Sequence, residues 1–161
     1  MVALFALKSY ATAERTRFRK PVGVMFVAVH WNEQYEVGDT RVDSQHKNLF
    51  EYVNRLEGII ERGKSGQKLD LTELENLVVF LDMYVNTHFA YEELCMNLRK
   101  CPAALQNKDA HNGFLEFWQN FQRENALSNV NLSTLEHLLE TLTTWLTNHI
   151  CKIDVQLRVK T

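Results

Sequence analysis

Apolar residues recur along most of this chain with the spacing of a helix. In four long stretches they return every three or four residues, which places them on one face of an α-helix. Short polar or Gly- and Pro-containing segments separate these stretches. The pattern therefore indicates an all-α fold, an antiparallel up-down-up-down four-helix bundle. The four predicted helices cover about residues 41–62, 71–99, 104–124 and 133–151.

Two of the predicted helices carry recognisable start signals. Either Asp70 or Thr72 is suited to cap the second helix, because a short polar side chain accepts hydrogen bonds from the first free amides. Ser133 and Glu136 have the spacing of a capping box and predict that the fourth helix begins there.

The first 30 residues form an N-terminal extension for which a short helix and an edge strand both remain open. The extension carries a basic cluster, Arg15, Arg17, Arg19 and Lys20. Residues 31–161 are predicted to form the bundle as one domain, entered through a loop that packs Trp31 and Tyr35 on the body.

The amino-acid composition limits the domain size, the classes of binding partner and the cellular compartment that we expect. A chain of 161 residues with 45% apolar residues can build one domain with a substantial core. A formal net charge of −2 gives no basic excess for binding nucleic acid, and no apolar run approaches the roughly 20 residues of a transmembrane helix. Three cysteines without a zinc-type spacing fit a reducing compartment, so we expect a cytoplasmic protein.

Polar side chains able to bind metals interrupt the apolar face of every predicted helix. Burying such groups is costly unless something inside the bundle satisfies them. The histidines alternate between early and late positions in successive helices, so antiparallel packing brings all four to the same end. The candidate ligands are His46, His88, Glu92, His111, His149 and Asp154.

The two candidate carboxylate ligands differ in how they can face the four histidines at this end of the bundle. Glu92 follows His88 by one helical turn and shares its face. Asp154 follows His149 by five residues, about 140° around a helix, so the fourth helix must end or distort before Asp154 can face the site. Imidazole and carboxylate ligands without a thiolate pair suit iron, zinc, manganese or copper, and this set suits two ions held close together.

Single histidines on apolar faces are usually satisfied core residues, but four with two carboxylates in register favour a metal centre. His30 and His137 lack such partners, and we place them outside the site.

Three segments of the chain resemble the hemerythrins and bacteriohemerythrins. The first combines Trp31, Tyr35 and Gly38 with the run from Val42 to Phe50. The second, His88-Phe89-Ala90-Tyr91-Glu92-Glu93, resembles that family's second-helix motif, and Trp145 to Ile150 followed by Asp154 resembles its closing motif.

The resemblance implies a four-helix bundle with two non-haem iron ions, bridged by carboxylates and an oxo or hydroxo group, that binds O₂ reversibly. Glu92 and Asp154 would bridge the irons. His46 and His88 would bind one iron, and His111 and His149 the other.

The chain departs from the family pattern at Asn107. The family has two histidines one turn apart in the third helix, whereas here only His111 is present. An amide oxygen is a weaker ligand than imidazole. We therefore expect the second iron to keep an open or solvent-filled position, with a less durable O₂ complex and faster oxidation.

This departure favours a sensor of O₂ or redox state over a carrier, and the resemblance adds the possibility of a fused signalling output domain such as a diguanylate cyclase. We expect a binding domain rather than an enzyme. The alternatives are an O₂ carrier or storage protein and a di-iron enzyme acting on peroxide or NO. Five apolar residues are expected to line the pocket: Phe50, Phe89, Trp118, Leu142 and Trp145.

Overall fold

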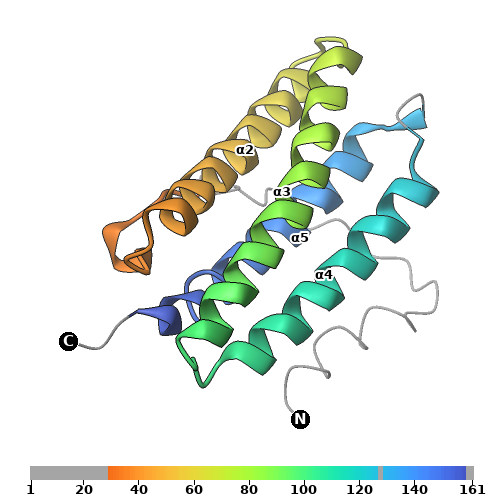
Figure 1. The fold of residues 1–161 in the computed structure, drawn as a ribbon. Helices are drawn as coiled ribbons and strands as arrows, with labels where there is room; N and C mark the ends of the chain where they lie inside the picture. Colours follow the sequence, from red (N-terminus) through yellow and green to blue (C-terminus); the bar gives the residue numbers. More distant parts are fainter. Residues whose placement is uncertain (1–28, 127–128, 159–161) are drawn as a thin grey trace, which may run out of the picture.

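The computed structural model describes residues 29–126 and 129–158, and within them it contains helices and no strand. The all-α four-helix bundle predicted from the sequence is confirmed (Figure 1). Most of the predicted extension, residues 1–28, lies outside the described residues. The four long helices are α2 (Thr40–Lys64), α3 (Leu71–Leu98), α4 (Ala104–Glu124) and α5 (Leu132–Asn148), with short 3-10 helices η1 (Glu33–Tyr35) and η3 (Asp154–Leu157).

Successive helices run in opposite directions, and short connections join them (Figure 1). α2 packs closely on both α3 and α5, and α3 packs on α4. α4 and α5 come close at fewer points. None of the described helices is both long enough and apolar enough to cross a membrane.

Side-chain caps fix where three of the helices begin. Asp39 accepts hydrogen bonds from the amides of Arg41 and Val42 at the start of α2. Asp70 caps α3, in agreement with the first of the two predicted alternatives. The predicted capping box at Ser133 is wrong. Asn131 caps α5 instead, accepting from the Thr134 amide, because its extended backbone places the amide side chain over the first turn.

The loop before α2 is held by a buried carboxylate. Asp43, in the first turn of α2, accepts hydrogen bonds from the Val37 amide at 2.7 Å and the Gly38 amide at 3.1 Å. Gly38 has a φ of 81°, a conformation that favours glycine. These contacts hold the entry loop against the end of the bundle that carries the polar residues.

The interior divides along its length into an apolar half and a polar half. The apolar half, distant from the histidines, contains fully buried side chains such as Ile60 and Leu139. It also contains an apolar cavity of about 220 Å³ between the helices, with Leu56, Leu77 and Leu138 in its wall. The polar half contains the candidate ligands.

Candidate metal centre

The polar half of the bundle brings together side chains from every long helix. α2 contributes His46, α3 contributes His88 and Glu92, and α4 contributes His111. The remaining two lie beyond the last long helix: His149 is the C-cap of α5, and Asp154 is the first residue of η3. All six side chains are at most 2% exposed, so the layer is closed to bulk water.

The four imidazoles form two pairs. The Nε2 atoms of His46 and His88 lie 3.2 Å apart, and those of His111 and His149 lie 2.9 Å apart. In both pairs the nitrogen furthest from the backbone faces the centre of the bundle. Two sets of imidazole donors therefore converge on neighbouring positions.

Both carboxylates reach both pairs. Glu92 Oε1 lies 3.7 Å from His46 Nε2, and its Oε2 lies 3.4 Å from His111 Nε2. Asp154 Oδ2 lies 3.4 Å from His46 Nε2, and its Oδ1 lies 3.1 Å from His149 Nε2. A carboxylate whose two oxygens face two different histidine pairs is placed to bridge two metal ions.

Asp154 reaches the site because α5 stops early. The helix ends at Asn148, three residues before the predicted end at Cys151. The carbonyl of His149 then accepts from the amides of both Ile153, at 2.7 Å, and Asp154, at 3.2 Å, so the chain turns tightly. This turn is the local distortion that the five-residue spacing requires, and it returns the Asp154 carboxylate to the face of His149.

Two comparisons with known proteins bear on this arrangement. The family model for the hemerythrin HHE cation binding domain matches residues 37–157. The chain belongs to the hemerythrin HHE family. A bacteriohemerythrin of Clostridium acetobutylicum is 24% identical over 130 residues, which are 81% of this chain and 96% of the relative. A bacteriohemerythrin of Stenotrophomonas maltophilia is 27% identical over 127 residues, 74% of this chain and 72% of the relative.

The layer of candidate ligands contains buried oxygen atoms that a metal ion would satisfy. Four inward-facing atoms are buried without any hydrogen-bond partner in the described protein: Glu92 Oε1, Asn107 Oδ1 and both oxygens of Asp154. Unpaired buried oxygens are rare because each one loses its contact with water. Two geometric groups able to hold a cation overlap here, His46-His88-Glu92 and Glu92-His111-His149-Asp154. The donor set fits the cation-binding character of the hemerythrin HHE domain.

Burial sets the protonation of the ligands. Desolvation lowers the pKa of His46 from 6.5 to about 4, and it lowers the pKa of His88 and His149 well below the ordinary value. These imidazoles therefore stay neutral at pH 7 and keep a lone pair for a metal. Burial, and then the nearby Glu92, raise the pKa of Asp154 well above the ordinary range, because a second negative charge in this layer needs a cation to balance it.

Two residues that the sequence reasoning did not assign to the site hold the imidazoles from outside. Gln45 Oε1 lies 3.1 Å from His88 Nδ1, and Glu93 Oε1 lies 3.1 Å from His111 Nδ1. Such partners orient a ligand histidine and raise its basicity. Gln45 is adjacent in sequence to His46, and Glu93 is adjacent to Glu92. This adjacency to a candidate ligand could have identified both residues from the sequence.

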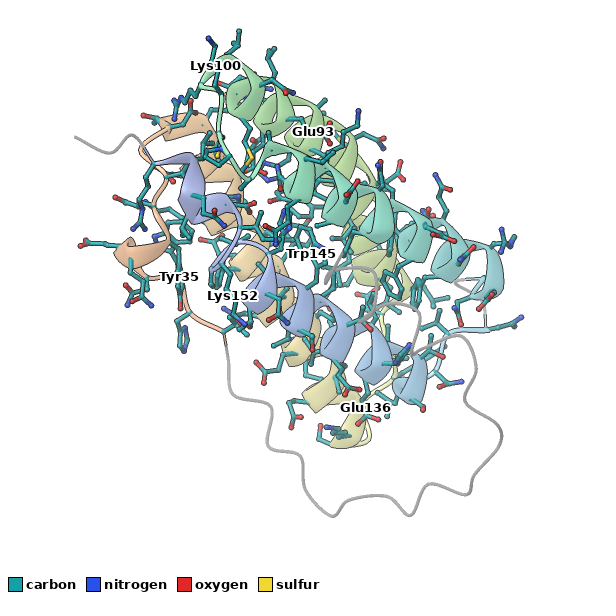
Figure 2. All side chains as sticks on the ribbon, turned by 90° about the horizontal axis from the view of Figure 1, so that it is seen from below. Tyr35, Glu93, Lys100, Glu136, Trp145 and Lys152 are labelled. Atoms are coloured by element: carbon teal, nitrogen blue, oxygen red, sulfur yellow. The ribbon has the colours of Figure 1, made fainter. Side chains whose placement is uncertain are left out.

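Aromatic rings pack against the imidazoles. Phe89 stacks on His111 with centroids 3.7 Å apart, and Trp145 stacks on His149 with centroids 4.2 Å apart. Figure 2 shows Trp145 among the side chains between the helices. Phe50 is buried against Trp31 and the η1 residue Tyr35, on the α2 side of the site.

The other two predicted pocket residues lie further from the ligands. Trp118 and Leu142 line the apolar cavity of the opposite half of the bundle. His30 and His137 are exposed and lie outside the site, where the sequence pattern places them.

Asn107 lies within the layer, one turn before His111, and is fully buried. Its Nδ2 donates a hydrogen bond of 3.2 Å to Glu92 Oε2, and its Oδ1 has no partner in the described protein. The Asn107 amide therefore faces the layer from α4 and contacts Glu92, and it offers no nitrogen lone pair.

Proposed function

We propose that this domain holds two iron ions and responds to O₂ or to redox state. The observation that carries the proposal is the spanning position of Glu92 and Asp154, whose oxygens face both imidazole pairs at 3.1–3.7 Å. One carboxylate between two metal positions is compatible with many sites. Two such carboxylates, with neutral imidazoles at each end, favour a pair of ions held close together.

In this proposal His46 and His88 hold one iron, and His111 and His149 hold the other. The iron pair supplies O₂ binding and redox chemistry when it is bound. The protein excludes bulk water from the layer, and Gln45 and Glu93 fix the orientation of one imidazole in each pair. The choice of iron rests on the family resemblance, because imidazole and carboxylate ligands also suit zinc, manganese and copper.

Asn107 favours a sensing role over a carrying role. A carrier needs a durable O₂ complex, whereas a sensor needs only that ligand or redox state shifts a conformational equilibrium. With an amide that donates to Glu92 in place of an imidazole, the iron at His111 and His149 has one strong ligand fewer. That iron would then be open to solvent and small ligands and would oxidise faster.

The proposal extends to a signalling role in which a fused output domain, such as a diguanylate cyclase, receives the response. We also propose a cytoplasmic setting, supported by three cysteines that form no disulfide, Cys95, Cys101 and Cys151.

The direct test is metal content per chain together with the absorption spectrum, recorded after reduction and again after exposure to O₂. We expect two irons per chain and charge-transfer bands that disappear on reduction and return in air. A protein purified from iron-supplemented cells with zinc, or with less than one iron per chain, would overturn the di-iron assignment.

The role of Asn107 is tested by Asn107→His, with Asn112→His as the matched control. Both positions are on α4, but Asn112 is exposed. We expect Asn107→His to slow autoxidation several-fold and to slow exchange of solvent-derived ligands, while Asn112→His leaves both rates unchanged. Equal rates in all three proteins would refute the role of Asn107.

Two other functions are separated by the same measurements. A carrier or storage protein would form an O₂ complex that survives many cycles of deoxygenation without oxidation. An enzyme would show steady turnover with peroxide or NO that continues well beyond one equivalent per site. The hydrogen bond from Asn107 to Glu92 leaves one metal position short of a strong ligand, which disfavours a durable carrier, and that open position is the one feature that supports an enzyme.

A further inference from the structure

One buried hydroxyl near the metal centre has no partner in the described protein. Tyr84 lies on α3, one turn before His88, and is 5% exposed. Its phenol oxygen is buried and makes no hydrogen bond. A buried O–H without an acceptor is unfavourable, and a phenylalanine would fill nearly the same space without that cost.

The ring position shows where this hydroxyl lies. The Tyr84 ring stacks on the His88 imidazole, with centroids 4.7 Å apart and planes inclined by 28°. The two side chains leave the same face of α3 in parallel. Because tyrosine is the longer side chain, its buried hydroxyl lies beyond the ring that stacks on the His88 imidazole.

Two buried carboxylates, Glu92 and Asp154, act electrostatically on the Tyr84 hydroxyl. Burial raises the pKa of Tyr84 well above its ordinary value, and the charges of Glu92 and Asp154 raise it further. A phenol O–H at this place can donate a hydrogen bond to an acceptor in the layer. The neighbouring Phe80 ring, with its centroid 5.8 Å from that of Tyr84, offers no acceptor.

We propose that Tyr84 donates its hydroxyl hydrogen to a small anion that shares the centre with the metal ions. This role makes Tyr84 a specificity-determining residue. A ligand carrying negative charge gains a hydrogen bond that a neutral ligand of the same size does not. The inference rests on the proposed metal centre, and it concerns a residue outside the ligand set.

The test is an azide titration of the iron-loaded, oxidised protein and of its Tyr84→Phe variant. Phenylalanine keeps the stacking on His88 and removes only the hydroxyl. We expect azide to bind about tenfold more weakly to the variant, the size expected for one lost hydrogen bond to a charged group. Iron content should be unchanged, and the thermal midpoint without azide should not fall, because the unpartnered O–H is removed. The infrared stretching frequency of bound azide should shift, because its hydrogen bond is lost.

Tyr52→Phe is the matched control. Tyr52 is a half-buried tyrosine on α2 whose ring stacks on Phe80, away from the ligands. It should bind azide like the unmodified protein. Equal azide affinity and frequency in all three iron-loaded proteins would overturn the role of Tyr84 and leave the metal centre intact. Failure of the unmodified protein to load iron would instead refute the proposed function.

Discussion

The buried histidines predict a specific acid sensitivity of the metal-free protein. In the unfolded chain each imidazole takes up a proton near pH 6.5, whereas burial holds the pKa of His46 in the folded protein at about 4. Between pH 6.5 and pH 4 the His46 imidazole is therefore protonated in the unfolded state but not in the folded state. The stability that His46 contributes is present above pH 6.5 and is lost as the pH falls toward 4.

The magnitude follows from this difference in pKa. Lowering a pKa from 6.5 to about 4 corresponds to about 3 kcal/mol, of which about 2 kcal/mol is already lost at pH 5. His88 and His149 have pKa values lowered by the same cause, so they add losses with the same sign. Asp154 acts in the opposite direction. Its pKa is raised in the folded state, so protonation on acidification relieves part of its burial cost. His46, whose shift has a defined size, makes the expected effect destabilisation by acid.

Urea unfolding of the chelator-treated protein at pH 7, 6 and 5 measures this effect. We expect the free energy of unfolding to fall by about 2 kcal/mol across this range, with a constant dependence on urea concentration. His46→Gln should reduce the fall by about 2 kcal/mol, while His137→Gln, which removes an exposed histidine, should leave it unchanged. A stability that does not change between pH 7 and pH 5 would refute the reasoning.

Two further predictions concern the ligand turn and the start of α2. Asp154→Asn replaces a carboxylate that faces both histidine pairs by a neutral amide, so metal bound per chain should drop at both positions, whereas the exposed substitution Asp109→Asn should change nothing. Measured iron content equal to that of the unmodified protein would contradict the bridging role. Asp39→Ala removes the cap of α2 and should cost about 1 kcal/mol in urea unfolding with metal content unchanged. A loss below the error of the measurement would show that the Asp39 cap contributes nothing.

The sequence predicted correctly the features that follow from the helical spacing of apolar residues. Its apolar stripes predicted four helices, with most boundaries within one or two residues of those observed. The same periodicity identified inward-facing polar positions, and it showed that Asp154 needs a distorted helix end, which the bond pattern at His149 supplies. Periodicity is reliable here because burial of one face dominates the energetics of a bundle helix.

The sequence did not predict the features that depend on the direction of a side chain or on how closely two helices approach each other. The capping box at Ser133 fitted the sequence rule, but Asn131 lies two residues earlier and its amide completes the cap. The hydrogen bond from Asn107 to Glu92 joins two helices and requires rotamers that a single-helix pattern does not define. For the same reason the cavity between the helices, and the placement of Trp118 along it, became visible only in three dimensions.

The early end of α5 has a mechanical consequence. Of the six candidate ligands, His149 and Asp154 alone lie beyond a long helix, in a tight turn where the His149 carbonyl accepts from the amides of Lys152, Ile153 and Asp154. A bound ion would cross-link this turn to α2 and α4, because Asp154 faces both His46 and His149, and His149 faces His111. Loss of the ion should therefore remove a link between this turn and the two helices and lower the free energy needed to open the turn locally.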